Sequence, residues 1–71
     1  MKLKNWERYL VLTMDNHITT MLAHMHQEWG GTIALFEDMS PIPHHYKEFK
    51  KVLKFTEQNV SKLLRIQKKG G

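Results

Sequence analysis

Apolar residues recur at every third or fourth position through the first 29 residues of the chain. One helical face can hold all of them, because steps of three and four residues match the turn of an α-helix. The residues of this stripe are Leu3, Trp6, Leu10, Met14, Ile18, Met21, Met25 and Trp29. We therefore expect one long helix over residues 1–29, kinked near Asp15. The alternative is a strand over residues 8–13, which has strand propensity, followed by a helix from residue 16.

Two breaks divide the rest of the chain. Gly30-Gly31 suits a helix end, because glycine reaches positive φ without a Cβ penalty. Pro41 and Pro43 oppose a continuous helix after that point. Residues 32–40, between the breaks, are too few to show a period. We expect a short helix there, with a strand over residues 32–37 as the alternative.

Residues 44–69 show the clearest helical pattern. On a helical wheel, an apolar stripe lies within about 60° of Phe49, and the basic residues lie about 100–220° away from it. The pattern predicts one helix of about 25 residues that begins after Pro43 and ends at Gly70.

The three segments together predict an all-α protein. We expect a helical hairpin or a three-helix arrangement, in which two long amphipathic helices are joined by a short helix or loop. A single domain covers residues 1–71. In the alternative reading, strands near 8–13 and 32–37 would pair with each other in a small α+β fold.

The size of the chain limits its core. Seventy-one residues without cysteine bury little surface and have no disulfide or thiolate ligand to compensate. The apolar fraction of 41% is nevertheless too high for a disordered chain. We therefore expect a homodimer or an obligate partner. No segment resembles a secretory signal or a membrane span, so we expect a cytoplasmic protein that does not bind membranes.

The net charge of +4 is unevenly distributed. Residues 1–43 carry three basic and five acidic side chains, whereas residues 44–71 carry eight basic and two acidic ones. The surplus predicts a polyanionic or acidic partner for the C-terminal part. A solvated face that only keeps the protein soluble would have the same composition.

Residues 46–65 resemble a helix-turn-helix segment of bacterial and phage repressors. The five spaced apolar positions of such a segment are occupied by Phe49, Leu53, Phe55, Val60 and Leu63. Thr56 stands where the second helix would be capped. The resemblance implies that exposed side chains of this helix read bases in DNA. The residues in those positions are Gln58, Asn59, Lys62 and Arg65, with Lys68 and Lys69 on the same basic face.

Two lysines depart from the pattern of that family. Lys50 stands where members of that family have a small residue, and Lys54 stands where they usually have a glycine. We therefore favour a single continuous helix over this segment, with the helix-turn-helix as the alternative.

No spacing of residues indicates catalysis. The chain has no glycine-rich phosphate loop, nucleophile motif or HExxH sequence, so we expect neither an enzyme nor a cofactor. Its histidines are His17, His24, His26, His44 and His45. On a helix they would not converge, and we expect no metal site.

Our first hypothesis is a small regulatory protein, of the kind that phages and plasmids encode, that binds and modulates another protein. A component of the transcription or nucleic-acid machinery is a plausible target. An apolar stripe and a basic face would make the contact. The residues we expect at this contact are Trp6, Met14, Met21, Met25, Trp29, Lys47, Lys51 and Lys54. The alternative hypothesis is a DNA-binding transcription regulator that uses residues 46–65.

Overall fold

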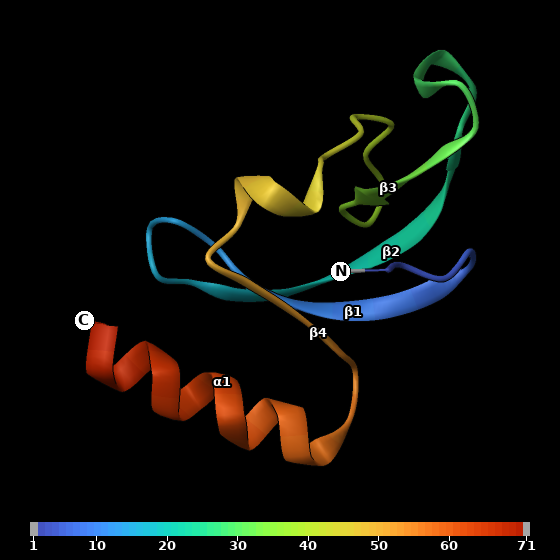
Figure 1. Ribbon diagram of the computed structural model, residues 1–71. Coiled ribbons are helices and arrows are strands. Elements are labelled where there is room, and N and C mark those ends of the chain that lie inside the picture. Colours follow the sequence, from blue (N-terminus) through green and yellow to red (C-terminus); the bar gives the residue numbers. More distant parts are fainter. Residues whose placement is uncertain (1, 71) are drawn as a thin grey trace.

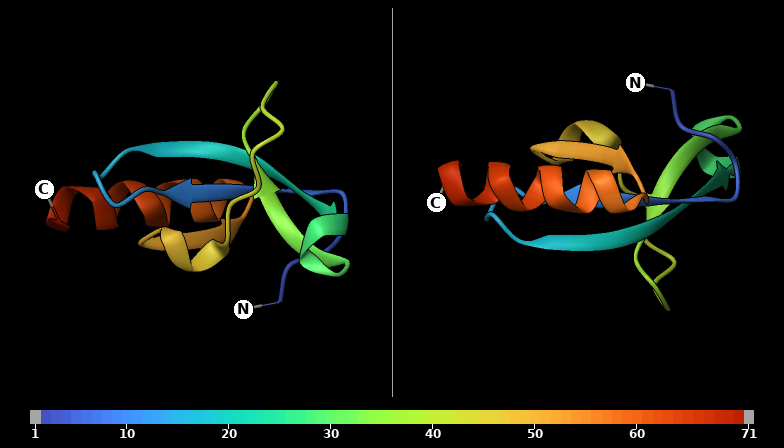
Figure 2. Two further views of the ribbon diagram at one scale, coloured as in Figure 1. Left: turned by 90° about the horizontal axis from the view of Figure 1, so that it is seen from above. Right: turned by 90° about the horizontal axis from the view of Figure 1, so that it is seen from below.

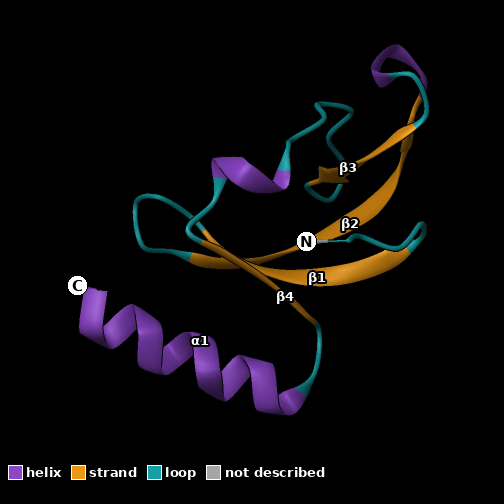
Figure 3. Cartoon of the chain, in the orientation of Figure 1, coloured by secondary structure: helices purple, strands orange, loops and turns teal. Residues whose placement is uncertain are grey.

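A computed structural model describes residues 2–70, and its main element is a four-stranded antiparallel sheet (Figure 1). The strands are β1 (Glu7–Leu12), β2 (Ile18–His26), β3 (Thr32–Phe36) and β4 (Lys51–Lys54), in the order β3-β2-β1-β4. The chain ends in helix α1 (Glu57–Gly70), and two single 3-10 turns are η1 (Gln27–Trp29) and η2 (Tyr46–Glu48) (Figure 3). The prediction of an all-α fold is therefore wrong.

The long helix expected over residues 1–29 is replaced by β1, a turn and β2. Tyr9 to Leu12 are buried one after another, because elements cover both faces of the sheet at β1. β2 opens with Ile18-Thr19-Thr20, and these β-branched residues favour a strand. Asn16 has a φ of 68° in the turn between the strands, a conformation that asparagine tolerates better than most residues.

The alternative strands near 8–13 and 32–37 are present as β1 and β3, but they do not pair with each other. β2 lies between them, in place of the helix expected from residue 16. Its register sets Leu22 opposite both Arg8 of β1 and Phe36 of β3. Gly30 and Gly31 both have positive φ, as their sequence predicts, but they turn the chain from η1 into β3 and end no α-helix.

The helix expected over residues 44–69 is present only in its second half. Residues 44–54 contain η2 and β4, and residues 46–65 therefore hold one α-helix where a helix-turn-helix has two. The cap at Thr56 does form, since its Oγ1 accepts a hydrogen bond from Asn59 N–H at 3.1 Å. β4 pairs with β1, where Leu53 lies opposite Leu10. Pairing with β1 thus overrides the helical periodicity of this segment.

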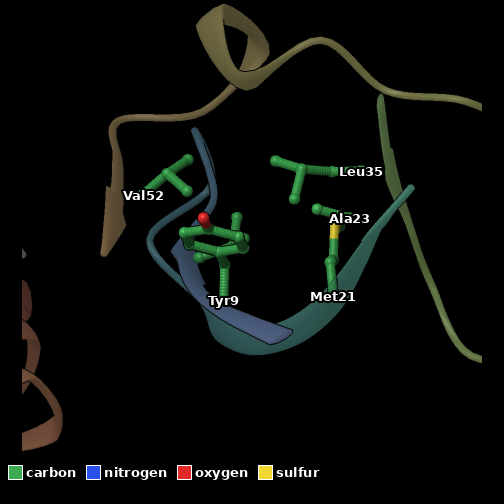
Figure 4. Packing of buried hydrophobic residues seen from close by; sticks show 6 residues of the cluster. Tyr9, Met21, Ala23, Leu35 and Val52 are labelled. Atoms are coloured by element: carbon green, nitrogen blue, oxygen red, sulfur yellow. The ribbon is translucent and has the colours of Figure 1, made fainter. Parts of the chain in front are cut away.

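The core lies in two clusters on opposite faces of the curved sheet. α1 covers one face, where Leu63 packs with Leu10 and Leu12. The segment that contains η2 lies on the other side of the sheet (Figure 2). Figure 4 shows the buried side chains on that face pointing toward one another. They are Tyr9, Val11, Met21, Ala23, Leu35 and Val52.

Among the described residues, none of the helices has the length and apolar character needed to cross a membrane.

Candidate functional site

A basic groove runs between η2 and β4. Its volume is about 480 Å³. Its apolar lining, which we call its floor, includes Tyr46 and Phe49, and both residues pack against the core cluster on the η2 side of the sheet. The rest of its lining comes from Lys47, Lys50, Lys51, Val52 and Leu53. Three lysines therefore line the groove together with this apolar floor.

Local hydrogen bonds fix η2 at the start of this groove. His45 N–H donates to Glu48 Oε2 at 2.6 Å, and Lys47 N–H donates to His45 Nδ1 at 3.1 Å, which makes a reciprocal cap. His44 Nδ1 lies 3.2 Å from Glu48 Oε1. Partial burial acts to raise the pKa of Glu48, but its contacts with His45 and His44 outweigh burial and hold this pKa below its ordinary value. The carboxylate therefore stays ionised at neutral pH.

Strand β4 presents lysines on both faces of the sheet. Leu53 packs with the cluster under α1, whereas Val52 packs with the cluster on the η2 face. Because successive side chains of a strand point to opposite faces, Lys51 lies on the α1 face and Lys54 on the η2 face. Both lysines are exposed.

The four lysines of this region differ in their partners. Lys54 Nζ lies 3.5 Å from Glu7 Oε1, and Lys50 Nζ donates to Asn16 Oδ1 at 3.5 Å. Lys47 and Lys51 form no ion pair with any other residue between positions 2 and 70. These two charges are therefore available to an external partner.

One flank of α1 extends the basic surface. Asn59 Nδ2 donates to the carbonyl oxygen of Lys54 at 2.8 Å, so the flank that holds Asn59 faces the end of β4. Lys62 and Lys69 follow at spacings of three and ten residues, which places them on the same flank. Both are exposed.

A second feature is a stack of three rings on the part of the α1 face that the helix leaves open, in which Trp6 is exposed, His24 is half-buried and Phe36 is buried. The ring of His24 lies between Trp6, at a centroid distance of 4.9 Å, and Phe36, at 3.9 Å. Trp6 is 68% exposed and has a φ of 63°, an unusual conformation for a bulky residue. Arg8 Nη1 bonds Asp38 Oδ1 at 3.1 Å beside this stack. The surrounding charges are mixed, so the stack itself forms no basic surface.

The residues predicted to form a protein-binding stripe are dispersed. The stripe assumes a helix, in which residues three or four positions apart lie on one face. In a strand, side chains alternate between the two faces, so the same positions point in different directions. Met21 is buried in the core. Trp6, Met14 and Met25 are exposed, and Trp6 stacks on His24, whose side chain points to the opposite face of β2 from that of Met25. Trp29 is half-buried against the rings of His26 and His45.

The lysines predicted to bind a partner, unlike the residues of the apolar stripe, lie close together. Lys47 and Lys51 line the same groove, and Lys54 lies at the far end of β4. The sequence interpretation did not include Lys50, Tyr46 and Phe49 in this set. The signal for them was present, because residues 46–54 interleave lysines with aromatic and branched apolar residues.

Most of the residues predicted to read DNA are exposed on α1. They are Gln58, Lys62, Arg65, Lys68 and Lys69. Asn59 is half-buried, and its side-chain amide donates to the backbone carbonyl of Lys54, as described above. One N–H of the Asn59 amide is therefore already used within the chain.

The histidines between positions 2 and 70 do not form a metal-binding cluster. Throughout residues 2–70, no three side chains of the metal-binding types converge on a point that could hold an ion. His44 and His45 are used at η2, and His24 lies within the ring stack.

Comparisons with known protein families, with curated proteins and with solved structures find no match to this chain. The function is therefore inferred from the geometry of the surfaces described above.

Proposed function

We propose that this protein is a small regulatory module that binds an acidic segment of another protein in the groove beside β4. The observation that carries the proposal is that lysines without an ion-pair partner and an apolar floor occur together in one groove. Within residues 2–70, Lys47 and Lys51 have no counter-ion, and both line the groove together with Tyr46 and Phe49.

An acidic protein segment suits both parts of this groove. Carboxylates would pair with the lysines and steer the encounter, which raises the association rate. Apolar side chains of the same segment would cover the floor of the groove. Aromatic residues at the centre of a contact contribute much of its binding energy.

Nucleic acid is the second candidate partner, and the observation that favours it is on α1. The exposed residues Lys62, Arg65 and Lys69 continue the basic surface away from the groove. Such a surface attracts phosphates without sequence preference, and the attraction weakens steeply with salt. The groove itself offers fewer contacts to a phosphate backbone, because much of its lining is apolar.

A binding experiment separates the two partners. An acetylated peptide of alternating glutamate and valine, a peptide of alternating lysine and valine, and a short DNA duplex would each be titrated into the protein at two salt concentrations. We expect the acidic peptide to bind and the basic peptide not to bind. Failure of the acidic peptide to bind at low salt would refute the proposal.

Charge-reversal variants then locate the contact. We expect Lys47→Glu/Lys51→Glu to weaken binding of the acidic peptide about tenfold or more. Lys68→Glu is the control, because Lys68 lies on α1 outside the flank that faces β4 and changes the net charge in the same direction. Duplex binding tighter than peptide binding, and lost in Lys62→Glu/Arg65→Glu, would favour the nucleic-acid function instead.

A further inference from the structure

The two edges of the sheet differ in a way that bears on how a partner binds. At the β3 edge, Leu35 N–H donates to His44 O at 2.9 Å and His44 N–H donates to Leu35 O at 2.8 Å. This bridge covers β3 near its C-terminal end. At the other edge, β4 pairs with β1 and has no strand on its outer side within residues 2–70. The carbonyl oxygen of Lys54, at the end of β4, already accepts hydrogen bonds from Asn59 Nδ2 at 2.8 Å and from Thr56 N–H at 2.9 Å. The outward backbone groups left to bond another strand therefore lie before that carbonyl in β4.

We propose that the acidic segment binds as a fifth strand, paired through its backbone with the outer edge of β4. This inference rests on the proposed function and adds the mode of binding. A strand placed on this edge would run along the groove, since β4 supplies one of its walls. Backbone hydrogen bonds then give affinity, and alternate side chains give specificity.

The side chains beside this edge define the sequence that fits. One face of an added strand would meet Lys51 and, beyond it, the flank of α1 that carries Lys62. The other face would meet Val52, Lys54 and the apolar floor of the groove. Both faces thus combine lysine with apolar surface. A segment of about four to six residues that mixes glutamate or aspartate with apolar residues matches a four-residue edge strand.

The charges on the edge argue against the other occupants. A second copy of this chain would bring its own Lys51 and Lys54 against the same lysines, and like charges on facing strands oppose pairing. Nucleic acid has no backbone N–H and C=O ladder to pair with a strand. An acidic peptide supplies both the opposite charge and the ladder.

The test follows hydrogen exchange and binding with the same peptide of alternating glutamate and valine. In ¹⁵N-labelled protein saturated with peptide, we expect alternate amides of residues 51–54 to exchange at least about tenfold more slowly than in the free protein. A second peptide would have the same sequence with its central amides N-methylated, which keeps every charge and side chain but removes the donors. We expect it to bind at least about tenfold more weakly.

The outcomes separate this inference from the proposed function. Equal binding of the two peptides, with unchanged exchange in β4, would overturn strand addition and leave the acidic-partner function standing. No binding of either peptide would overturn both. The variant Lys68→Glu serves as the folded control, in which slowed exchange of β4 and the difference between the two peptides should persist.

Discussion

Asn16 and Gln67 bond each other twice across 51 positions of sequence. Asn16 Nδ2 donates to the carbonyl oxygen of Gln67 at 3.1 Å, and Gln67 Nε2 donates to the carbonyl oxygen of Asn16 at 2.9 Å. The pair fastens the last turns of α1 to the turn between β1 and β2. It therefore holds the helix over the core cluster that contains Leu63.

This pair gives a graded prediction for stability. Gln67→Ala removes one hydrogen bond and should cost about 0.5–1.5 kcal/mol of unfolding free energy. Asn16→Ala also places alanine at a φ of 68°, so we expect a larger loss, about 1–3 kcal/mol. Asn16→Gly loses the side-chain bonds but accepts the φ, and should fall between the two. Urea denaturation measures all three, and equal values for the alanine and glycine variants would contradict the conformational argument.

The packing of α1 on the sheet depends mainly on Leu63. It is fully buried with Leu10 and Leu12, whereas its neighbour Leu64 is 50% exposed. We expect Leu63→Ala to lower the unfolding free energy by about 2–5 kcal/mol. Leu64→Ala is the matched control and should change it by less than about 1 kcal/mol. Similar losses in the two variants, measured by thermal or urea unfolding, would mean that α1 packs through a different face.

The sequence predicts α1 well but misplaces the strands, and the reason is physical. In α1 the spacing of Val60 and Leu63, the cap at Thr56 and the basic end all point to a helix, and the structure agrees. Residues 1–29 also have helical spacing, but their β1–β2 pairing depends on contacts between residues far apart in sequence. The spacing of apolar residues within one segment does not indicate which distant segment will pair with it. Leu10 and Met21 thus lie on opposite faces of a sheet, although a wheel puts them on one stripe.

The candidate site was predictable only in part. Charge asymmetry alone indicates a basic C-terminal surface, and Lys47 and Lys51 do lie together. The groove required knowledge that residues 51–54 form an edge strand, which their lysine-rich composition favours but does not establish. The ring stack of Trp6, His24 and Phe36 could not be predicted, because it brings together residues from three separate segments.

Acid should weaken the cap at η2 through Glu48. The pKa of this carboxyl is lower in the folded protein than its ordinary value of 4.5, so its contribution to stability is present above that value and is lost as the pH falls through the folded pKa. The side chain is half exposed, which limits the effect to less than about 1 kcal/mol. We expect Glu48→Gln to be less stable than the wild type at pH 7 and to approach it at pH 2. A constant difference between the two proteins across this range would exclude a charged cap.

The lysines of β4 should also keep the open edge from pairing with other copies of the chain. An unpaired strand edge is a template for association, and exposed lysine is a common protection against it. We expect Lys51→Thr/Lys54→Thr to form dimers or larger species at concentrations where the wild type shows no association through this edge. Thr is used because it favours strands and is uncharged.

Analytical ultracentrifugation at several concentrations checks this last prediction, with Lys62→Thr/Lys68→Thr as a control that loses the same charge from α1. The control should sediment as the wild type does. Because the prediction concerns β4 alone, a wild-type homodimer formed elsewhere would not contradict it. Identical sedimentation of the β4 variant and the wild type would instead show that the lysines do not guard this edge, and their charge would then be explained by partner binding alone.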